Sequence, residues 1–195
     1  MLSLLLDSAN KELLVALYEN DKKIDEICYE AWQRQSELMI PELDKILKRN
    51  SIDPKTIDEI VVTKGPGSYT GVRIALTIAK IYALSLKIPC YAISSLGVLK
   101  DESKTSICLI NARSNRSYFG VYKTSGEVLI EDKVLPNKEV LEYIEAHKDF
   151  AVCGDVTYLG LINQDSDIAK NMMSLKNESN KVDNILTLKA VYLKD

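Results

Sequence analysis

The most constraining feature of this 195-residue sequence is a glycine-rich stretch, Gly65-Pro66-Gly67-Ser68-Tyr69-Thr70-Gly71. It lies between an apolar strand pattern at 60–62 and a long apolar helix pattern at 72–86, so it predicts a strand, a tight loop and a helix start. Glycines permit backbone angles that other residues avoid, and Ser68 or Thr70 can accept a hydrogen bond from the first turn of the helix. The loop is either a structural turn or an anion-binding site at a helix N-terminus. The candidate anion-binding residues are Gly65, Gly67, Ser68, Thr70 and Gly71.

The helix that follows the loop is apolar around most of its circumference. Its polar residues Arg73, Thr77 and Lys80 follow i, i+4 and i+7 spacing and occupy one narrow stripe. An ordinary surface helix has an apolar arc of about 100°, so this helix must be covered on more than one side. One side can be its own sheet. The other could be covered by a neighbouring helix or by a partner protein, and both possibilities remain open.

A second amphipathic helix is predicted at 36–49, where apolar residues recur at helical spacing along one face. If a partner covers both helices, its contacts would fall on their apolar and flanking polar positions. The predicted partner-interface residues are Ile40, Leu43, Leu47, Arg73, Thr77, Lys80 and Leu84.

Short strand patterns occur in two groups, one on each side of a polar segment at 101–104. Each group predicts a meander of three strands joined by short turns. The strands are 2–6, 13–18 and 24–32 in the first group, and 106–110, 117–123 and 127–134 in the second. From residue 163 onward the composition predicts loops and a fraying helix, before apolar residues at 185–193 dock the C-terminus. We therefore predict an α/β fold with two lobes, residues 1–102 and 103–195, each a mixed β-sheet with flanking helices.

Composition excludes several classes of protein. The net charge is −3, whereas a chain that binds nucleic acid alone normally carries a basic surplus. No apolar run reaches the ~18 residues that a bilayer-spanning helix needs, and the apolar start at 1–6 lacks the basic residues of a signal peptide. We therefore expect a cytoplasmic protein without membrane contacts, whose contact with RNA requires a partner.

Cysteine and histidine placement gives no sign of a metal site. Cys28, Cys90, Cys108 and Cys153 lie far apart in apolar runs, which predicts buried, reduced thiols. The only histidine, His147, lies in a polar run and is expected at a solvated helix end rather than in a site.

The glycine stretch and its continuation Val72-Arg73-Ile74 resemble the signature of the TsaB family, also called YeaZ, within the actin, sugar-kinase and Hsp70 superfamily. Other segments of the first hundred residues also resemble this family. They are Leu4-Leu5-Leu6-Asp7-Ser8, the segment from Ser36 to Pro41, Ile88-Pro89 and Ser94-Ser95-Leu96. The closing Tyr192-Leu193 resembles the family's usual end, which implies a complete chain. The resemblance implies two actin-like, ribonuclease H-like lobes.

The resemblance also implies a function. Family members pair with the larger TsaD protein, which carries the metal and the transfer chemistry, and with the ATPase TsaE. The complex transfers a threonylcarbamoyl group to the adenosine beside the anticodon of tRNAs that read codons starting with A. We therefore expect a chain that is no enzyme on its own but activates a TsaD-like subunit, meets tRNA only through the complex, and can also form homodimers. No cofactor is expected for the chain itself, with ATP or ADP a candidate ligand at the partner interface.

The resemblance further implies a vestigial phosphate site at Asp7 and Ser8. In catalytic relatives a pair of histidines binds a metal, and the matching positions here are Gln35 and Met39. Asn111 stands where the family has an acidic residue. We therefore expect neither a metal site nor a catalytic residue in this chain.

Two other classes of function remain open. The first is an enzyme, either a small ATPase or kinase of the same superfamily or a glycoprotease-like peptidase. A kinase needs carboxylates at both phosphate loops, of which Asp7 alone is present, and a peptidase needs a nucleophile with a base, which His147 does not supply. The second is a self-associating homodimeric scaffold that uses the apolar helix in both copies.

Overall fold

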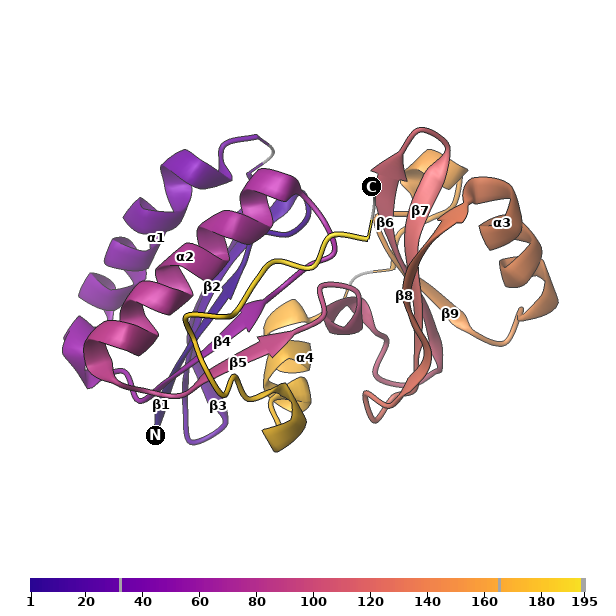
Figure 1. The fold of residues 1–195 in the computed structure, drawn as a ribbon. Coiled ribbons are helices and arrows are strands. Elements are labelled where there is room, and N and C mark those ends of the chain that lie inside the picture. Colours follow the sequence, from indigo (N-terminus) through magenta and orange to yellow (C-terminus); the bar gives the residue numbers. More distant parts are fainter. Residues whose placement is uncertain (32, 165, 194–195) are drawn as a thin grey trace.

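The computed structural model describes residues 1–31, 33–164 and 166–193. They form two lobes side by side, each built on one β-sheet with helices packed against it (Figure 1). The strand order is β3-β2-β1-β4-β5 in the N-terminal lobe and β8-β7-β6-β9 in the C-terminal lobe. This arrangement confirms the predicted α/β fold with two mixed sheets.

The N-terminal sheet combines an antiparallel meander with two parallel strands. Its strands are β1 (Leu2–Asp7), β2 (Glu12–Glu19), β3 (Lys22–Glu30), β4 (Glu59–Thr63) and β5 (Cys90–Ile93). The strand predicted at 24–32 is β3, and Trp32 lies outside the described residues. β4 runs parallel to β1 and β5 parallel to β4, so each link needs a crossover helix. Helices α1 (Gln35–Arg49) and α2 (Tyr69–Leu86) supply these crossovers and pack against each other beside the sheet (Figure 1).

The C-terminal lobe repeats this order with shorter connections. Its elements are β6 (Ser106–Arg113), β7 (Arg116–Tyr122), β8 (Val128–Pro136), α3 (Asn137–Ala146) and β9 (Ala151–Gly154). β6, β7 and β8 form an antiparallel meander, and β9 joins β6 in parallel just as β4 joins β1. The meander predicted to occur twice is therefore confirmed.

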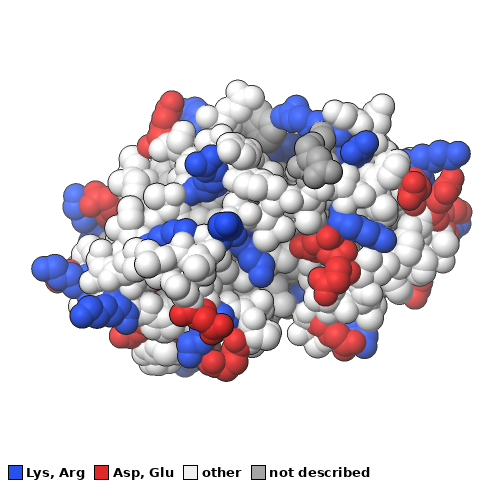
Figure 2. All heavy atoms as spheres, in the orientation of Figure 1, with Lys and Arg blue, Asp and Glu red and all other residues white. Residues whose placement is uncertain are grey.

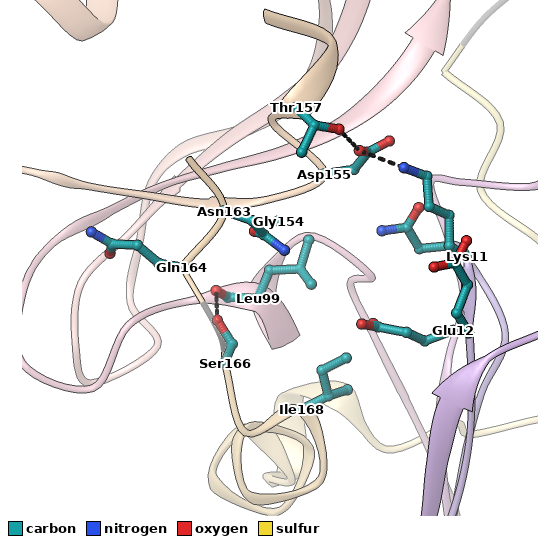
Figure 3. A pocket seen from close by; sticks show the side chains of 12 residues that line it. Lys11, Glu12, Leu99, Gly154, Asp155, Thr157, Asn163, Gln164, Ser166 and Ile168 are labelled. Atoms are coloured by element: carbon teal, nitrogen blue, oxygen red, sulfur yellow. Dashed lines mark hydrogen bonds and ion pairs between the residues drawn. The ribbon is translucent and has the colours of Figure 1, made fainter. Parts of the chain in front are cut away.

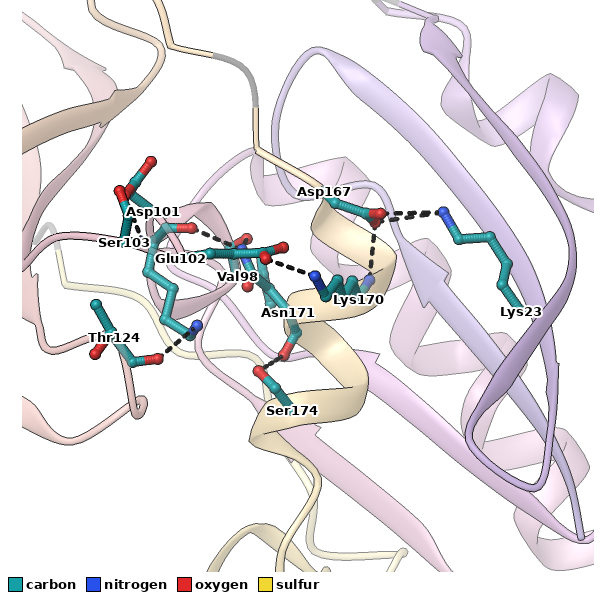
Figure 4. A network of polar contacts seen from close by, with 11 residues as sticks. Lys23, Val98, Asp101, Glu102, Ser103, Thr124, Asp167, Lys170, Asn171 and Ser174 are labelled. Atoms are coloured by element: carbon teal, nitrogen blue, oxygen red, sulfur yellow. Dashed lines mark hydrogen bonds and ion pairs between the residues drawn. The ribbon is translucent and has the colours of Figure 1, made fainter.

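The segment after residue 163 is more ordered than its polar composition suggests. Instead of a fraying helix it contains α4 (Ile168–Leu175), which buries one apolar face between the lobes. The buried Asn171 holds this helix in place, because its Nδ2 donates to the carbonyl oxygens of Val98 at 2.9 Å and Lys100 at 2.7 Å (Figure 4). Asp167 caps its N-terminus by accepting a hydrogen bond from the Lys170 N–H.

The residues after α4 return to the N-terminal lobe as an extended segment, 182–193, which we call the strap (Figure 1). The strap begins where the N–H of Val182 donates to the carbonyl oxygen of Cys90 at 2.9 Å, at the edge of β5. Near its end the N–H of Val191 donates to the carbonyl oxygen of Lys64 at 2.7 Å. Apolar strap residues therefore dock on the N-terminal lobe, although the division of the chain at residue 102 remains a prediction.

Two side-chain expectations need correction. Cys90, Cys108 and Cys153 are buried, but Cys28 is exposed, because it lies on the edge strand β3 and alternates with Ile27, the residue of that strand that faces the core. His147 ends α3 as expected but is half-buried, since its ring stacks on that of Tyr143 with centroids 4.0 Å apart.

Candidate functional site

The glycine loop is fastened to the turn that follows β1. Ser68 caps α2, since its Oγ accepts a hydrogen bond from the Gly71 N–H at 3.2 Å, and its own N–H donates to the carbonyl oxygen of Ala9 at 2.7 Å. The buried Ser8 hydroxyl donates to the carbonyl oxygen of Gly71 at 2.7 Å. These bonds confirm the predicted capping role of Ser68 and join the loop to the first strand.

Close backbone approach explains the glycines in this loop. A Cβ at Gly67 would collide with the carbonyl oxygen of Ala9, and one at Gly71 with the carbonyl oxygen of Ser8. Gly65 has φ +102°, and a Cβ there would lie 2.6 Å from the carbonyl oxygen of Val191 in the strap. The loop is thus a tight structural turn in which only glycine fits at positions 65, 67 and 71. The anion-binding interpretation remains a prediction.

Asp7 belongs to the structural core of this region. Its carboxylate is buried and accepts hydrogen bonds from the Thr63 hydroxyl and from the Ala9 N–H. Burial raises the pKa of the Asp7 carboxyl, while these hydrogen bonds act in the opposite direction. Its neighbour Ser8 is also buried, so both residues of the predicted phosphate site are occupied with protein partners.

An interlobe cleft holds two cavities. The larger, about 600 Å³, is lined from the N-terminal lobe by Gly67, Ser68 and Thr70, and from the C-terminal lobe by residues including Asn111 and Tyr158. The smaller, about 370 Å³, is shown in Figure 3. Lys11 and Asp155 line both cavities. The structure therefore brings part of the glycine loop together with Asn111 on one cleft.

The residues that the family resemblance places at the positions of metal ligands, Gln35 and Met39, have other contacts here. The buried Gln35 donates its Nε2 to the carbonyl oxygen of Asn10 at 3.0 Å, and Met39 lies in the core of the N-terminal lobe. Asn111 accepts a hydrogen bond from the Arg113 N–H at 2.8 Å through its side-chain oxygen. Within the described ranges, no three His, Cys, Asp or Glu side chains gather in a way that could hold a metal ion.

A shallow apolar groove runs along the outer face of α1 and α2. Ile40 on α1 is 55% exposed and Ile81 on α2 is 57% exposed, and Arg73 and Thr77 lie in the same groove. Exposed apolar side chains that adjoin one another in this way are typical of interaction surfaces, so the groove is a candidate partner site. We call this groove and the exposed residues beside it the docking face. Leu84, also exposed on α2, extends it.

The exposed residues of α1 and α2 differ from the interface residues predicted from the sequence. Leu43 and Leu47 are 3% and 4% exposed and pack in the core, because the apolar stripe of α1 faces its own sheet and α2. The docking face therefore excludes both leucines. Ile81 was not among the predicted residues, although it follows Thr77 by one helical turn, which is the spacing that could have revealed it.

The α2 side of the docking face is basic, since Arg73 and Lys80 are its only charged residues, whereas α1 has the exposed Glu37 and Asp44 on either side of Ile40. Lys and Arg side chains are visible over this part of the N-terminal lobe in Figure 2. At one end of the face the Arg73 guanidinium lies 5.0 Å from the centroid of the Tyr69 ring, and Tyr69 stacks on Tyr192 of the strap.

Two lobes that repeat one strand order and enclose a cleft define a protein of the actin-like class. A solved structure described as YeaZ from Pseudomonas aeruginosa has the same fold, with a TM-score of 0.79, 23% identity, and coverage of 98% of this chain and 99% of that chain.

Sequence comparisons identify the family. The family profile described as "TsaD: tRNA N6-adenosine threonylcarbamoyltransferase" matches residues 27–189. A Bacillus subtilis protein, "tRNA threonylcarbamoyladenosine biosynthesis protein TsaB", is 35% identical over 155 residues, which are 76% of this chain and 67% of that protein. The uncharacterized protein MG208 of Mycoplasma genitalium is 29% identical over 197 residues, 98% of this chain and 94% of its own length. The chain belongs to the TsaB (YeaZ) family.

Proposed function

We propose that this chain takes part in forming threonylcarbamoyladenosine in tRNA, as a non-catalytic activator of a TsaD-like subunit. The family relation supports the pathway, since the Bacillus subtilis relative is named for threonylcarbamoyladenosine biosynthesis. The observation that carries the partner role is the docking face, an exposed apolar groove on two helices with basic residues and no acidic residue on α2. An exposed apolar face of this kind needs a protein to cover it.

The side chains of the docking face indicate which groups a partner would place against it. Ile40, Ile81 and Leu84 offer an apolar centre, so the partner contributes apolar side chains there. Arg73 and Lys80 flank this centre on α2, so acidic groups or carbonyl oxygens of the partner would face them. A second copy that met this face through its own α2 would bring like charges together. This difference favours a TsaD-like subunit over a homodimer as the partner on this face.

The rest of the complex follows from this proposal. The transfer chemistry belongs to the TsaD-like subunit and ATP turnover to a TsaE-like ATPase, with ATP or ADP bound at the interface between the chains. Since this chain has a net charge of −3, tRNA would be recruited through the complex rather than by this chain alone. The activity would take place in the cytoplasm with its tRNA substrate. Of the helices in the described part of the chain, none combines the length and apolar character that crossing a bilayer requires.

Charge reversal on the docking face tests the proposal. The double variant Arg73→Glu with Lys80→Glu places acidic groups opposite the expected acidic or carbonyl groups, and like charges facing across an interface cost several kcal/mol. It should therefore bind the TsaD-like subunit at least about a hundredfold more weakly. Threonylcarbamoyladenosine formation in a reconstituted reaction should fall in parallel. The melting temperature of the isolated chain should change little, because exposed charges contribute little to folding.

A matched control carries the same change of charge elsewhere. Lys138→Glu with Lys148→Glu reverses two highly exposed lysines at the two ends of α3, in the other lobe. This variant should bind the TsaD-like subunit and support tRNA modification as the wild type does. Unchanged binding by the Arg73 and Lys80 variant would show that the interface lies elsewhere. Equal losses in both variants would show a general effect of net charge.

A further inference from the structure

An ion pair joins the two lobes across the cleft. Lys11 lies in the turn between β1 and β2, and Asp155 follows β9 in the other lobe. The Lys11 Nζ lies 3.0 Å from the Asp155 Oδ1 (Figure 3). Both residues line both cavities, as do Asn10 and Thr157, so the pair is part of the boundary between the 370 Å³ and 600 Å³ spaces.

The acidic end of this pair is held rigidly. The Asp155 N–H donates to the carbonyl oxygen of Leu109 at 3.0 Å, which continues the pairing of β9 with β6 beyond the last residue of the strand. The Thr157 hydroxyl donates to the Asp155 Oδ1 at 3.3 Å (Figure 3). The Asp155 side chain is only 7% exposed, so its charge is screened little by solvent.

The basic end is also anchored to its lobe. The main-chain carbonyl oxygen of Lys11 accepts a hydrogen bond from the Ala31 N–H at 3.0 Å. Gln35, the first residue of α1, donates its Nε2 to the carbonyl oxygen of Asn10 at 3.0 Å and approaches that of Lys11 at 3.5 Å. The pair therefore joins a buried, hydrogen-bonded carboxylate to a lysine whose main chain is fixed and whose side chain is 36% exposed.

A second set of polar contacts, which we call the Ser94 tie, joins the lobes beside a different cavity. Neither Lys11 nor Asp155 lines that cavity. Ser94, which follows β5, donates its hydroxyl to Asp132 of β8 at 2.5 Å, and the Tyr122 hydroxyl of β7 donates to the same carboxylate. All three residues line a cavity of about 440 Å³ between the lobes and the strap. The Ser94 tie would therefore remain if the Lys11 pair were broken.

We propose that Lys11 and Asp155 form a latch that holds the interlobe cleft closed without a bound ligand. Many two-lobed proteins close around a ligand that bridges their lobes. In this chain the Lys11 ammonium supplies the bridging positive charge itself. The orientation of the lobes is then fixed by the chain, whatever enters the cleft. Breaking the latch would join the two cavities and let the cleft widen on the side of Lys11 and Asp155, while the apolar core that α4 shares with both lobes keeps them in contact.

Removing the positive charge tests the latch. Lys11→Met keeps a long side chain without the ammonium, and Lys123→Met is the control, because Lys123 pairs with Glu127 inside the C-terminal lobe. The measurements are the radius of gyration by small-angle X-ray scattering and amide hydrogen exchange. Lys11→Met should increase the radius of gyration and accelerate exchange by about tenfold at 110–113 and 154–158, while α3 stays protected. Lys123→Met should match the wild type in both measurements.

A charge swap shows whether the ion pair itself is responsible. Lys11→Asp combined with Asp155→Lys restores opposite charges across the cleft, so it should return both the radius of gyration and the exchange rates toward wild-type values. Wild-type behaviour of Lys11→Met would overturn the latch. It would also be overturned if Lys11→Met opens or unfolds the chain and the charge-swapped variant behaves identically, since Lys11 would then act through packing. None of these measurements requires the partner, so the latch can fail or hold independently of the proposed function.

Discussion

Adding one carbon atom at Gly67 should destabilise the chain more than its small size suggests. In Gly67→Ala the new Cβ would collide with the carbonyl oxygen of Ala9, which also accepts the Ser68 N–H at 2.7 Å. Relieving the collision must move the loop away from the turn after β1. We expect a loss of about 1 kcal/mol from this hydrogen bond and about 1 to 3 kcal/mol from backbone strain. The sum is about 2 to 4 kcal/mol, or a decrease of about 4 to 16 °C in the melting temperature of a chain of this length.

Gly160→Ala is the matched control. Gly160 has φ +74°, but nothing lies within 4 Å of its expected Cβ, so only the unfavourable backbone angle contributes. Its cost should be about 1 kcal/mol. Calorimetry and urea unfolding measure both variants under the same conditions. A Gly67→Ala melting temperature within about 2 °C of wild type would refute the argument from close approach. If that variant also lost partner-dependent activity, the glycine loop would be a binding site rather than a turn.

Three further predictions concern buried polar groups and chemistry. Asp7→Asn keeps the Oδ1 that accepts both hydrogen bonds and removes the buried charge. Because burial raises the pKa of Asp7 above its ordinary value of 3.8, the wild type loses stability as pH rises through the raised pKa. The variant should therefore be the more stable one at pH 7, with a difference that shrinks toward pH 4 in urea titrations. Asn171→Ala leaves the carbonyl oxygens of Val98 and Lys100 without their donor and should lower the free energy of unfolding by about 2 to 4 kcal/mol, measured by urea unfolding; an unchanged midpoint would contradict this. The purified chain should neither hydrolyse ATP nor retain a transition metal, which phosphate-release assays and metal analysis would check. ATP turnover of about 1 per second without a partner would show that the chain is catalytic on its own.

Much of the fold could be predicted because its periodicity is local. The strands of both meanders and the two crossover helices have apolar residues at spacings that depend only on their own geometry. Ser68 was recognisable as a cap because a small hydroxyl residue stands directly before the helix. The α4 helix was predicted only as a fraying helix, because its short apolar face alternates with Lys170 and Asn171, whose partners come from a segment about seventy residues earlier in the chain.

The candidate site was less predictable, because it depends on which face each helix turns outward. Ile40, Leu43 and Leu47 recur at helical spacing and should share one face of α1. In the structure, however, Ile40 is exposed and the two leucines are buried. Which of these residues is buried depends on where α2 packs against α1, and the sequence of α1 alone does not indicate this. The contacts of Lys11 with Asp155 join residues 144 positions apart, and nothing in the spacing of either residue indicates them.

The strap has a consequence for the order in which the chain can mature. The glycine loop of the N-terminal lobe is completed by Val191, whose N–H bonds to Lys64, and the docking face ends at Tyr192, which stacks on Tyr69. These residues are synthesised after the elements of the C-terminal lobe, whereas the sheet they complete is made from the first half of the sequence. The N-terminal lobe therefore cannot finish folding during its own synthesis. The complete face first exists only after residues 191 and 192 have been added, so shorter nascent chains lack the contacts of Val191 and Tyr192.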